Sequence, residues 1–208
     1  DFSLQPLSLD SLPSSNDSSQ DSSDPLKGWS LDSSSSSKWG DLLGRFSTEN
    51  LSKSFSLDGQ PASIAFDFIR VDSWDGEAFV IKSGDHVLLS QRFSVGASSN
   101  GVIGGDAVSP VSGSTDIPGQ GTFSWSITPI ETAYGADAAI GNDRWNDQKF
   151  RIEIQAPSGL DQLDLSLSST LNQSLDDESW AISDFSLQPL SLDSLPSSND
   201  SSQDSSDP

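Results

Sequence analysis

The sequence is organised around the stretch Ile69-Arg70-Val71-Asp72-Ser73-Trp74-Asp75-Gly76-Glu77. The residues that lead into it, 62–71, are apolar at roughly every second position, which is typical of a half-buried β-strand. The strand then breaks into an acidic turn, where Gly76 permits a tight change of chain direction. We therefore predict a strand that ends in a cluster of carboxylates.

The acidic turn holds three carboxylates, those of Asp72, Asp75 and Glu77, within six residues. Carboxylates this close repel one another when they are unpaired, so we expect a cation among them. Calcium is the simplest candidate, because it is a hard ion that takes oxygen ligands and is the default choice outside cells. The alternative is a solvated acidic turn whose carboxylates face water.

The composition limits the classes of function. The chain has 208 residues and a net charge of -21, which favours one domain with flanking segments and argues against nucleic acid or an anionic membrane as partners. It has no cysteine, so neither disulfides nor thiolate metal sites are expected. We also expect no membrane insertion, because no run of about 18 apolar residues occurs.

The two ends of the chain are identical. Residues 1–25 and 184–208 both read DFSLQPLSLDSLPSSNDSSQDSSDP, which corresponds to a period of 183 residues. A tandem array of identical units explains this identity, and an engineered duplication is the alternative. The predicted partners are therefore identical neighbouring repeats, joined head to tail.

The repeat sets the expected domain boundaries. We predict a β-sandwich domain over 26–192, preceded by 1–25 as the terminal strand and linker of a preceding repeat. Residues 193–208 are then the linker to the next repeat, and both linkers are expected to be disordered or extended because they are acidic and rich in serine. Residues 1–9 either hang loose while 184–192 closes the domain, or add as a strand to a neighbour.

The remaining apolar pattern predicts an all-β protein. Alternating segments without a helical period indicate an antiparallel β-sandwich of jelly-roll type. The expected strands are 53–57, 77–81, 86–93, 121–130, 150–154, 163–167 and 180–187, in addition to 62–71. Residues 33–37 are expected to form a loop or an exposed hairpin, and 94–121 a long loop or insertion.

A second acidic cluster, Asp176-Asp177-Glu178-Ser179-Trp180, lies just before the last predicted strand. If that strand neighbours 62–71, the two clusters meet at one end of the sandwich. Their carboxylates then need a shared cation.

Four segments together carry a resemblance to a known module: LLGRFSTENLSKSFSL, IAFDFIRVDSWDGEAFVI, WNDQKFRIEI and LDLSLSSTLNQSLDDESWAISDFSL. They resemble a jelly-roll repeat of large repetitive surface proteins, notably of marine and cyanobacterial bacteria, which is related in form to laminin-G-like and carbohydrate-binding sandwiches. The resemblance covers roughly 26–192, and the final strand departs from it at 181–184. It implies a calcium ion held by acidic residues at Asp72, Asp75, Glu77, Asp147, Asp177 and Glu178.

Two functions from different classes follow. The first is a calcium-stabilised structural repeat unit of an extracellular surface protein, filament or adhesin. The second is a surface-displayed carbohydrate-binding module, in which Trp29, Trp39 or Trp145 stacks on glycans. An enzyme is not expected, because carboxylates crowded into one turn suit a metal cage better than a pair separated across a cleft.

Overall fold

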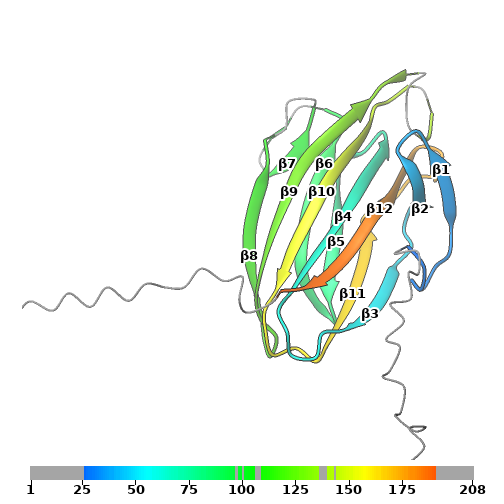
Figure 1. Ribbon diagram of the computed structural model, residues 1–208. Coiled ribbons are helices and arrows are strands. Elements are labelled where there is room, and N and C mark those ends of the chain that lie inside the picture. Colours follow the sequence, from blue (N-terminus) through cyan, green and yellow to red (C-terminus); the bar gives the residue numbers. More distant parts are fainter. Residues whose placement is uncertain are drawn as a thin grey trace, which may run out of the picture.

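The predicted all-β sandwich is confirmed. The computed structural model describes residues 26–190 except 97, 100, 106–108, 136–139 and 143, and in this part of the chain it contains two packed sheets (Figure 1). The first six strands are β1 Ser34–Ser37, β2 Gly40–Phe46, β3 Leu51–Ser56, β4 Ala62–Asp72, β5 Asp75–Ser83 and β6 His86–Ser94. The other six are β7 Val102–Gly104, β8 Val111–Ile117, β9 Gly121–Ala133, β10 Asp147–Ala156, β11 Gln162–Ser169 and β12 Glu178–Pro189.

The strand order is that of a jelly roll. One sheet has the order β1-β2-β12-β4-β10-β9-β8, and the other has the order β3-β11-β5-β6-β7. Early strands pair with late ones in a nested way, β2 with β12, β3 with β11 and β4 with β10. This nesting wraps a long antiparallel ribbon into two facing sheets. The parallel pairing of β6 with β7 is the one departure from the expected antiparallel pattern among the described strands.

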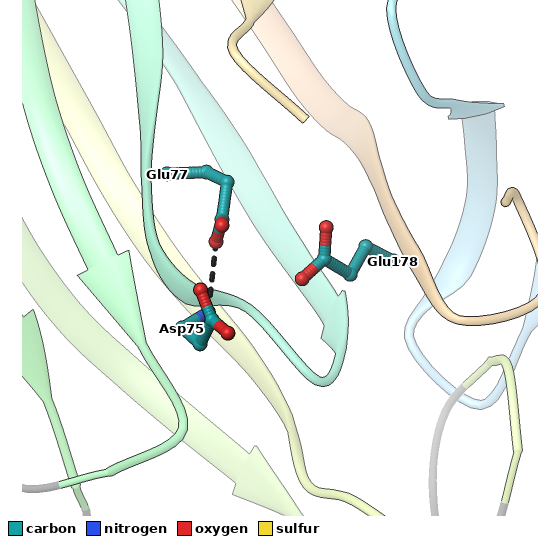
Figure 2. Close-up of side chains that lie close together, drawn as sticks. All are labelled: Asp75, Glu77 and Glu178. Atoms are coloured by element: carbon teal, nitrogen blue, oxygen red, sulfur yellow. Dashed lines mark hydrogen bonds between the residues drawn. The ribbon is translucent and has the colours of Figure 1, made fainter. Parts of the chain in front are cut away.

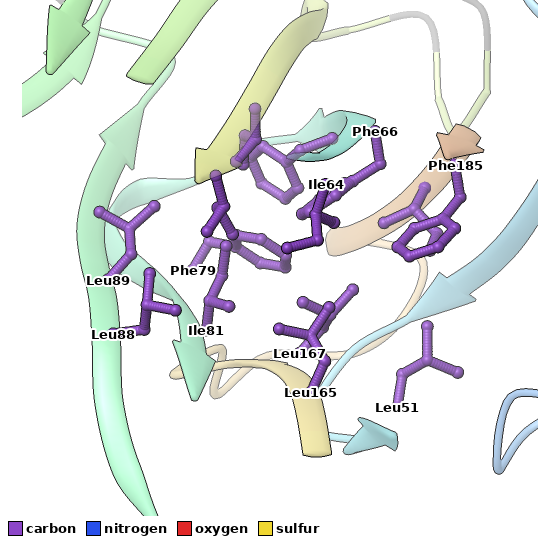
Figure 3. Packing of buried hydrophobic residues seen from close by; sticks show 14 of the residues in the cluster. Leu51, Ile64, Phe66, Phe79, Ile81, Leu88, Leu89, Leu165, Leu167 and Phe185 are labelled. Atoms are coloured by element: carbon purple, nitrogen blue, oxygen red, sulfur yellow. The ribbon is translucent and has the colours of Figure 1, made fainter. Parts of the chain in front are cut away.

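The core fills the space between the sheets. Figure 3 shows Ile64, Phe66 and Phe185 facing the leucines and Phe79 of the five-stranded sheet. Phe68 lies at the centre of an aromatic group, stacked on Phe79 at a centroid distance of 4.2 Å. Burial of this many aromatic side chains supplies the main driving force for folding.

Strand β4 is buried on both faces, so the prediction of a half-buried strand was wrong. Its inner face enters the core, while Ile69 and Val71 on the outer face are fully buried and form a second apolar cluster with Leu42 and Ala181. Trp39 and Ile140 pack against that cluster from the β1–β2 turn and the β9–β10 loop. A strand in the middle of a sheet is covered on both faces when loops fold back over it, and its apolar run is then continuous.

The expectations for the less regular segments had mixed outcomes. Residues 33–37 do form an exposed hairpin, since β1 pairs with β2. The long loop expected over 94–121 was wrong in part, because it contains β7 and β8. Strand β8 reads VSGSTDI and lies at the edge of its sheet, where backbone pairing to β9 suffices and few apolar side chains are needed.

The predictions for 1–25, 191–192 and 193–208, including strand addition by 1–9, lie outside the described residues. They remain predictions.

Candidate metal centre

The two acidic clusters meet at one end of the sandwich. Strands β4 and β12 are neighbours, as expected, and Asp72 is the ladder partner of Glu178. The connection from β4 to β5 is fastened to the segment before β12, because the backbone N–H and the hydroxyl of Ser73 donate to the carbonyl of Asp177 at 3.1 and 2.9 Å. Acidic residues far apart in sequence are therefore held side by side.

Trp74 anchors this crossing between the sheets. Its side chain is fully buried, and its indole N–H donates to the carbonyl of Ser179 at 2.9 Å. The chain thus leaves the seven-stranded sheet at Asp72 and enters the five-stranded sheet at Asp75 around a fixed indole. The geometry of the turn depends on packing as well as on Gly76.

Three carboxylates converge at this turn. Asp75, Glu77 and Glu178 each offer an oxygen, and these oxygens lie within 4.8 Å of one another (Figure 2). Asp75 is exposed, Glu77 is half-buried and Glu178 is fully buried. In Figure 2 the Glu178 carboxylate faces the other two from the opposite sheet. We call these three residues the acidic trio.

Glu178 carries an unpartnered buried oxygen. Its Oε1 accepts a hydrogen bond of 3.0 Å from the side-chain amide of Gln173, whereas its buried Oε2 has no hydrogen-bond partner. Burial, together with the charges of Glu77, Asp75 and Asp177, raises the pKa of Glu178 to about 7, and the hydrogen bond from Gln173 opposes this rise. A buried carboxylate oxygen without a partner costs free energy unless a proton or a cation satisfies it.

The spacing of the acidic trio is compatible with a metal ion of the size of calcium. Calcium binds oxygens at about 2.3–2.6 Å, so two ligands on opposite sides of one ion are separated by about 5 Å. Among the described residues, no Lys or Arg nitrogen lies within 4.0 Å of a carboxylate oxygen of the trio, and the five ion pairs all involve other carboxylates. Arg92 instead donates to the backbone carbonyl of Gly76, between Asp75 and Glu77, at 2.6 Å. The backbone N–H of Asp75 donates to Glu77 Oε2 at 2.7 Å, which holds that side chain over the turn. Three of the six to eight ligands that calcium takes are thus present, and carbonyls or water would supply the rest.

Asp72 binds the β9–β10 loop and is not part of the acidic trio. Both its oxygens accept from the backbone N–H of Asn142, at 3.0 and 3.3 Å, and Arg45 lies 3.6 Å away. A Cβ added at Gly141 would lie 2.2 Å from Oδ2 of Asp72, so the close approach of this loop requires glycine. Burial raises the pKa of Asp72 to about 6 despite the hydrogen bond from Asn142.

Asp147 also secures the β9–β10 loop. Its Oδ1 accepts from the backbone N–H of Asp72 at 3.1 Å, and its Oδ2 accepts from that of Ile140 at 2.7 Å. Burial raises the pKa of Asp147, while these two hydrogen bonds and the charge of Arg70 lower it. Both carboxylate oxygens of Asp147 accept hydrogen bonds within the protein. Asp147 and Asp72 are therefore a buried pair that holds the β9–β10 loop in place.

Asp177 lies near both the acidic trio and the pair Asp72 and Asp147, since its charge acts on Glu178 and on Asp72. Its carboxylate accepts from the hydroxyl of Ser73 at 3.0 Å, in addition to the contacts of its carbonyl. The structure therefore brings together three of the six acidic residues that the sequence suggested. The others hold the backbone in place around them.

Sequence reasoning missed the basic and amide side chains of this end. Arg70 is fully buried and donates to the carbonyl of Asp72 at 2.9 Å and to Oδ1 of Asn146 at 2.7 Å. Arg45 donates to the hydroxyl of Ser179 at 2.8 Å. The sequence did contain a signal for this arrangement, because Arg70 lies near the end of an apolar strand. An arginine in such a position is rarely buried without acidic or carbonyl partners.

The three tryptophans expected for glycan binding lie in different surroundings. Trp29 is 7% exposed and packs edge-on against Phe55 and Phe185, so it belongs to the core. Trp39 is half-buried over the outer apolar cluster. Trp145 is 44% exposed and is the only one of the three at the surface.

No protein-family model matches the chain, and neither the curated proteins nor the solved structures contain a match. Within the described residues, no helix is long and apolar enough to span a membrane.

Proposed function

We propose that the chain is a calcium-stabilised structural repeat unit of an extracellular surface protein, filament or adhesin built from tandem identical domains. The observation that carries this proposal is the buried carboxylate of Glu178, whose Oε2 has no hydrogen-bond partner and which lies beside the carboxylates of Asp75 and Glu77. A divalent cation satisfies that oxygen and neutralises most of the charge of the trio. Calcium suits the donor set, because all the donors are carboxylate oxygens.

The position of the trio gives the ion a structural role. Asp75 and Glu77 belong to β5 of the five-stranded sheet, whereas Glu178 begins β12 of the seven-stranded sheet. An ion bound to all three joins the two sheets directly. Such a link stabilises the folded state because the unfolded chain lacks the assembled site.

The tandem arrangement rests on the repeated sequence. Residues 184–189, which recur as 1–6, form the end of β12 in the structure. A copy of the last strand at the start of the chain is expected when one unit follows another without interruption. The charge of -21 suits a protein exposed to millimolar calcium outside the cell.

The resemblance to jelly-roll repeats of bacterial surface proteins supports the same proposal. It rests on the motifs Asp72-Ser73-Trp74-Asp75-Gly76-Glu77 and Asp176-Asp177-Glu178-Ser179-Trp180, which together contribute the whole trio.

Thermal unfolding in EDTA and in millimolar calcium tests the proposal. At a hundredfold excess over Kd, binding to the folded state alone adds about 3 kcal/mol. For a domain of this size, that free energy corresponds to a rise in Tm of roughly 6–12 °C. Magnesium at the same concentration is the control for ionic strength. Equal midpoints in EDTA and calcium would show that a proton, rather than a cation, satisfies Glu178.

A carbohydrate-binding module is the second candidate, because two exposed aromatic rings flank one loop. Tyr134 is 51% exposed just after β9, and Trp145 is 44% exposed just before β10. Exposed aromatic rings of this kind stack on sugar rings in binding modules. Screening the protein against a glycan array, with Trp145→Ala as the comparison, tests this candidate. Glycan binding that persists in Trp145→Ala would show that Trp145 is not part of the binding surface.

A further inference from the structure

The two ends of β12 have different surroundings. Glu178 at its start contributes to the acidic trio, and Pro189 at its end is followed by Leu190, whose N–H donates to the carbonyl of Pro61 at 2.7 Å. A strand from Glu178 to Pro189 spans roughly 35 Å. The chain therefore leaves the fold at the end of the sandwich opposite the trio, as the course of β12 in Figure 1 shows.

The first described segment attaches to that same half. Trp29 packs edge-on against Phe185 at a centroid distance of 5.1 Å and against Phe55 at 6.1 Å. The N–H of Ser30 donates to the carbonyl of Ser52 in β3 at 2.8 Å. Phe185 lies within the register shift between Ser183 and Ser186, just past the midpoint of β12 as counted from Glu178.

The register shift also changes the neighbours of β12. Before it, residues 180–182 pair with both β2 and β4; after it, residues 186–189 pair with β4 alone. The aromatic contact between Trp29 and Phe185 lies where β2 no longer pairs with β12. The segment that begins the unit thus packs against the segment that ends it.

We infer that the ion site and the connection between neighbouring units lie in opposite halves of the sandwich and act independently of each other. This inference rests on the proposed function. Calcium binds at the Glu178 end and stabilises each folded unit. The chain connects to the neighbouring units through the opposite half, which contains Trp29 and Pro189. The distance between units is then set by the spacer Asp193–Pro208 and is independent of calcium.

A two-unit chain tests the inference. Because 184–208 repeats 1–25, residue 208 continues directly into a second copy of residue 26. The protein has no cysteine, so Ser90→Cys in each unit provides the only pair of thiols for spin labels. Ser90 is exposed in the middle of β6 and is not part of the trio. Distances between the labels are measured by electron–electron double resonance in EDTA and in calcium.

We expect calcium to raise the Tm of the two-unit chain and to leave the distribution of label distances unchanged. Removing eight of the sixteen spacer residues should shorten the end-to-end distance of a flexible spacer by about 6 Å and move the label distances to shorter values, in EDTA and in calcium alike.

Two results would overturn the inference. One is a distance distribution that narrows or shifts when calcium is added, since the ion would then act at the connection between units. The other is a mean distance that does not respond to the shorter spacer, since the units would then contact each other directly. Failure of calcium to raise Tm overturns the proposed function instead, and the spacer measurement still tests the position of the connection between units.

Discussion

Glu178 and Asp72 are backbone partners in the β12–β4 ladder, yet their carboxylates serve different parts of the molecule. Asp72 is bound by the backbone N–H of Asn142 and lies near Arg45, so its charge is matched within the protein. Glu178 has one oxygen bound to Gln173 and the other unpartnered beside two further carboxylates. Stability at this end of the sandwich therefore depends on what occupies the space beside Glu178.

Glu178→Gln is expected to abolish the rise in Tm produced by calcium while leaving a folded protein in EDTA. The amide keeps the size of the side chain but loses the charge that an ion needs, and it relieves repulsion from Asp75 and Glu77. Calcium titrations followed by thermal unfolding measure the effect. Glu153→Gln, on an exposed carboxylate of β10, is the matched control and should keep the full calcium response.

The pH dependence of stability is expected to change sign with calcium. In EDTA, the folded protein holds protons more tightly than the unfolded chain, because burial raises the pKa of Glu178 from 4.5 to about 7 and that of Asp72 from 3.8 to about 6. This contribution is fully present below the ordinary pKa values and is lost as the pH rises through about 6 to 7.

In calcium the opposite trend is expected, because a bound ion requires deprotonated carboxylates. Urea midpoints at pH 5 and pH 8, in EDTA and in calcium, measure both trends. Glu178→Gln should weaken the dependence in EDTA. Stability in EDTA that increases from pH 5 to pH 8 would contradict the raised pKa of Glu178.

Asp147→Asn is expected to lower the free energy of unfolding by about 1–3 kcal/mol without changing the calcium response. The amide has one acceptor oxygen in place of two, so the backbone N–H of Asp72 or of Ile140 loses its partner. Urea unfolding measures the loss. Asp161→Asn, at an exposed position, should have little effect. Loss of calcium binding in Asp147→Asn would instead make Asp147 a ligand, as the resemblance implied.

Trp29→Ala is expected to destabilise the domain by about 3–5 kcal/mol, because it opens a cavity beside the stacked rings of Phe55 and Phe185. Trp145→Ala should change the free energy of unfolding by less than about 0.5 kcal/mol, since Trp145 lies at the surface and is 44% exposed. Urea unfolding of both variants makes the comparison. Equal losses would mean that Trp145 has packing partners not seen in this structure.

Removal of residues 1–25 is expected to leave both Tm and the oligomeric state unchanged. The strand that these residues would duplicate is already present as β12 of the same chain. Calorimetry and sedimentation measure the two properties, and limited proteolysis should leave 26–192 as the surviving fragment. Loss of multimers after the deletion would support strand addition by 1–9, and unfolding would show that the unit begins at residue 1.

Much of the fold could be predicted because its strands alternate. Phe150, Ile152 and Ile154 face the core from β10, as their spacing indicated. Alternation reports burial on one face only, so it failed for β4, which is buried on both faces, and for β8, which needs few apolar residues at an edge.

The sequence by itself determined the all-β class, the acidic motifs and the repeat, because each is a property of consecutive residues. Only the tertiary structure decided which carboxylates meet. Asp72 and Asp75 are three residues apart, but the chain crosses between sheets at Trp74, so one faces a loop and the other faces Glu178. Residue spacing along a chain cannot specify such a division, since it depends on how strands from both ends of the sequence pack.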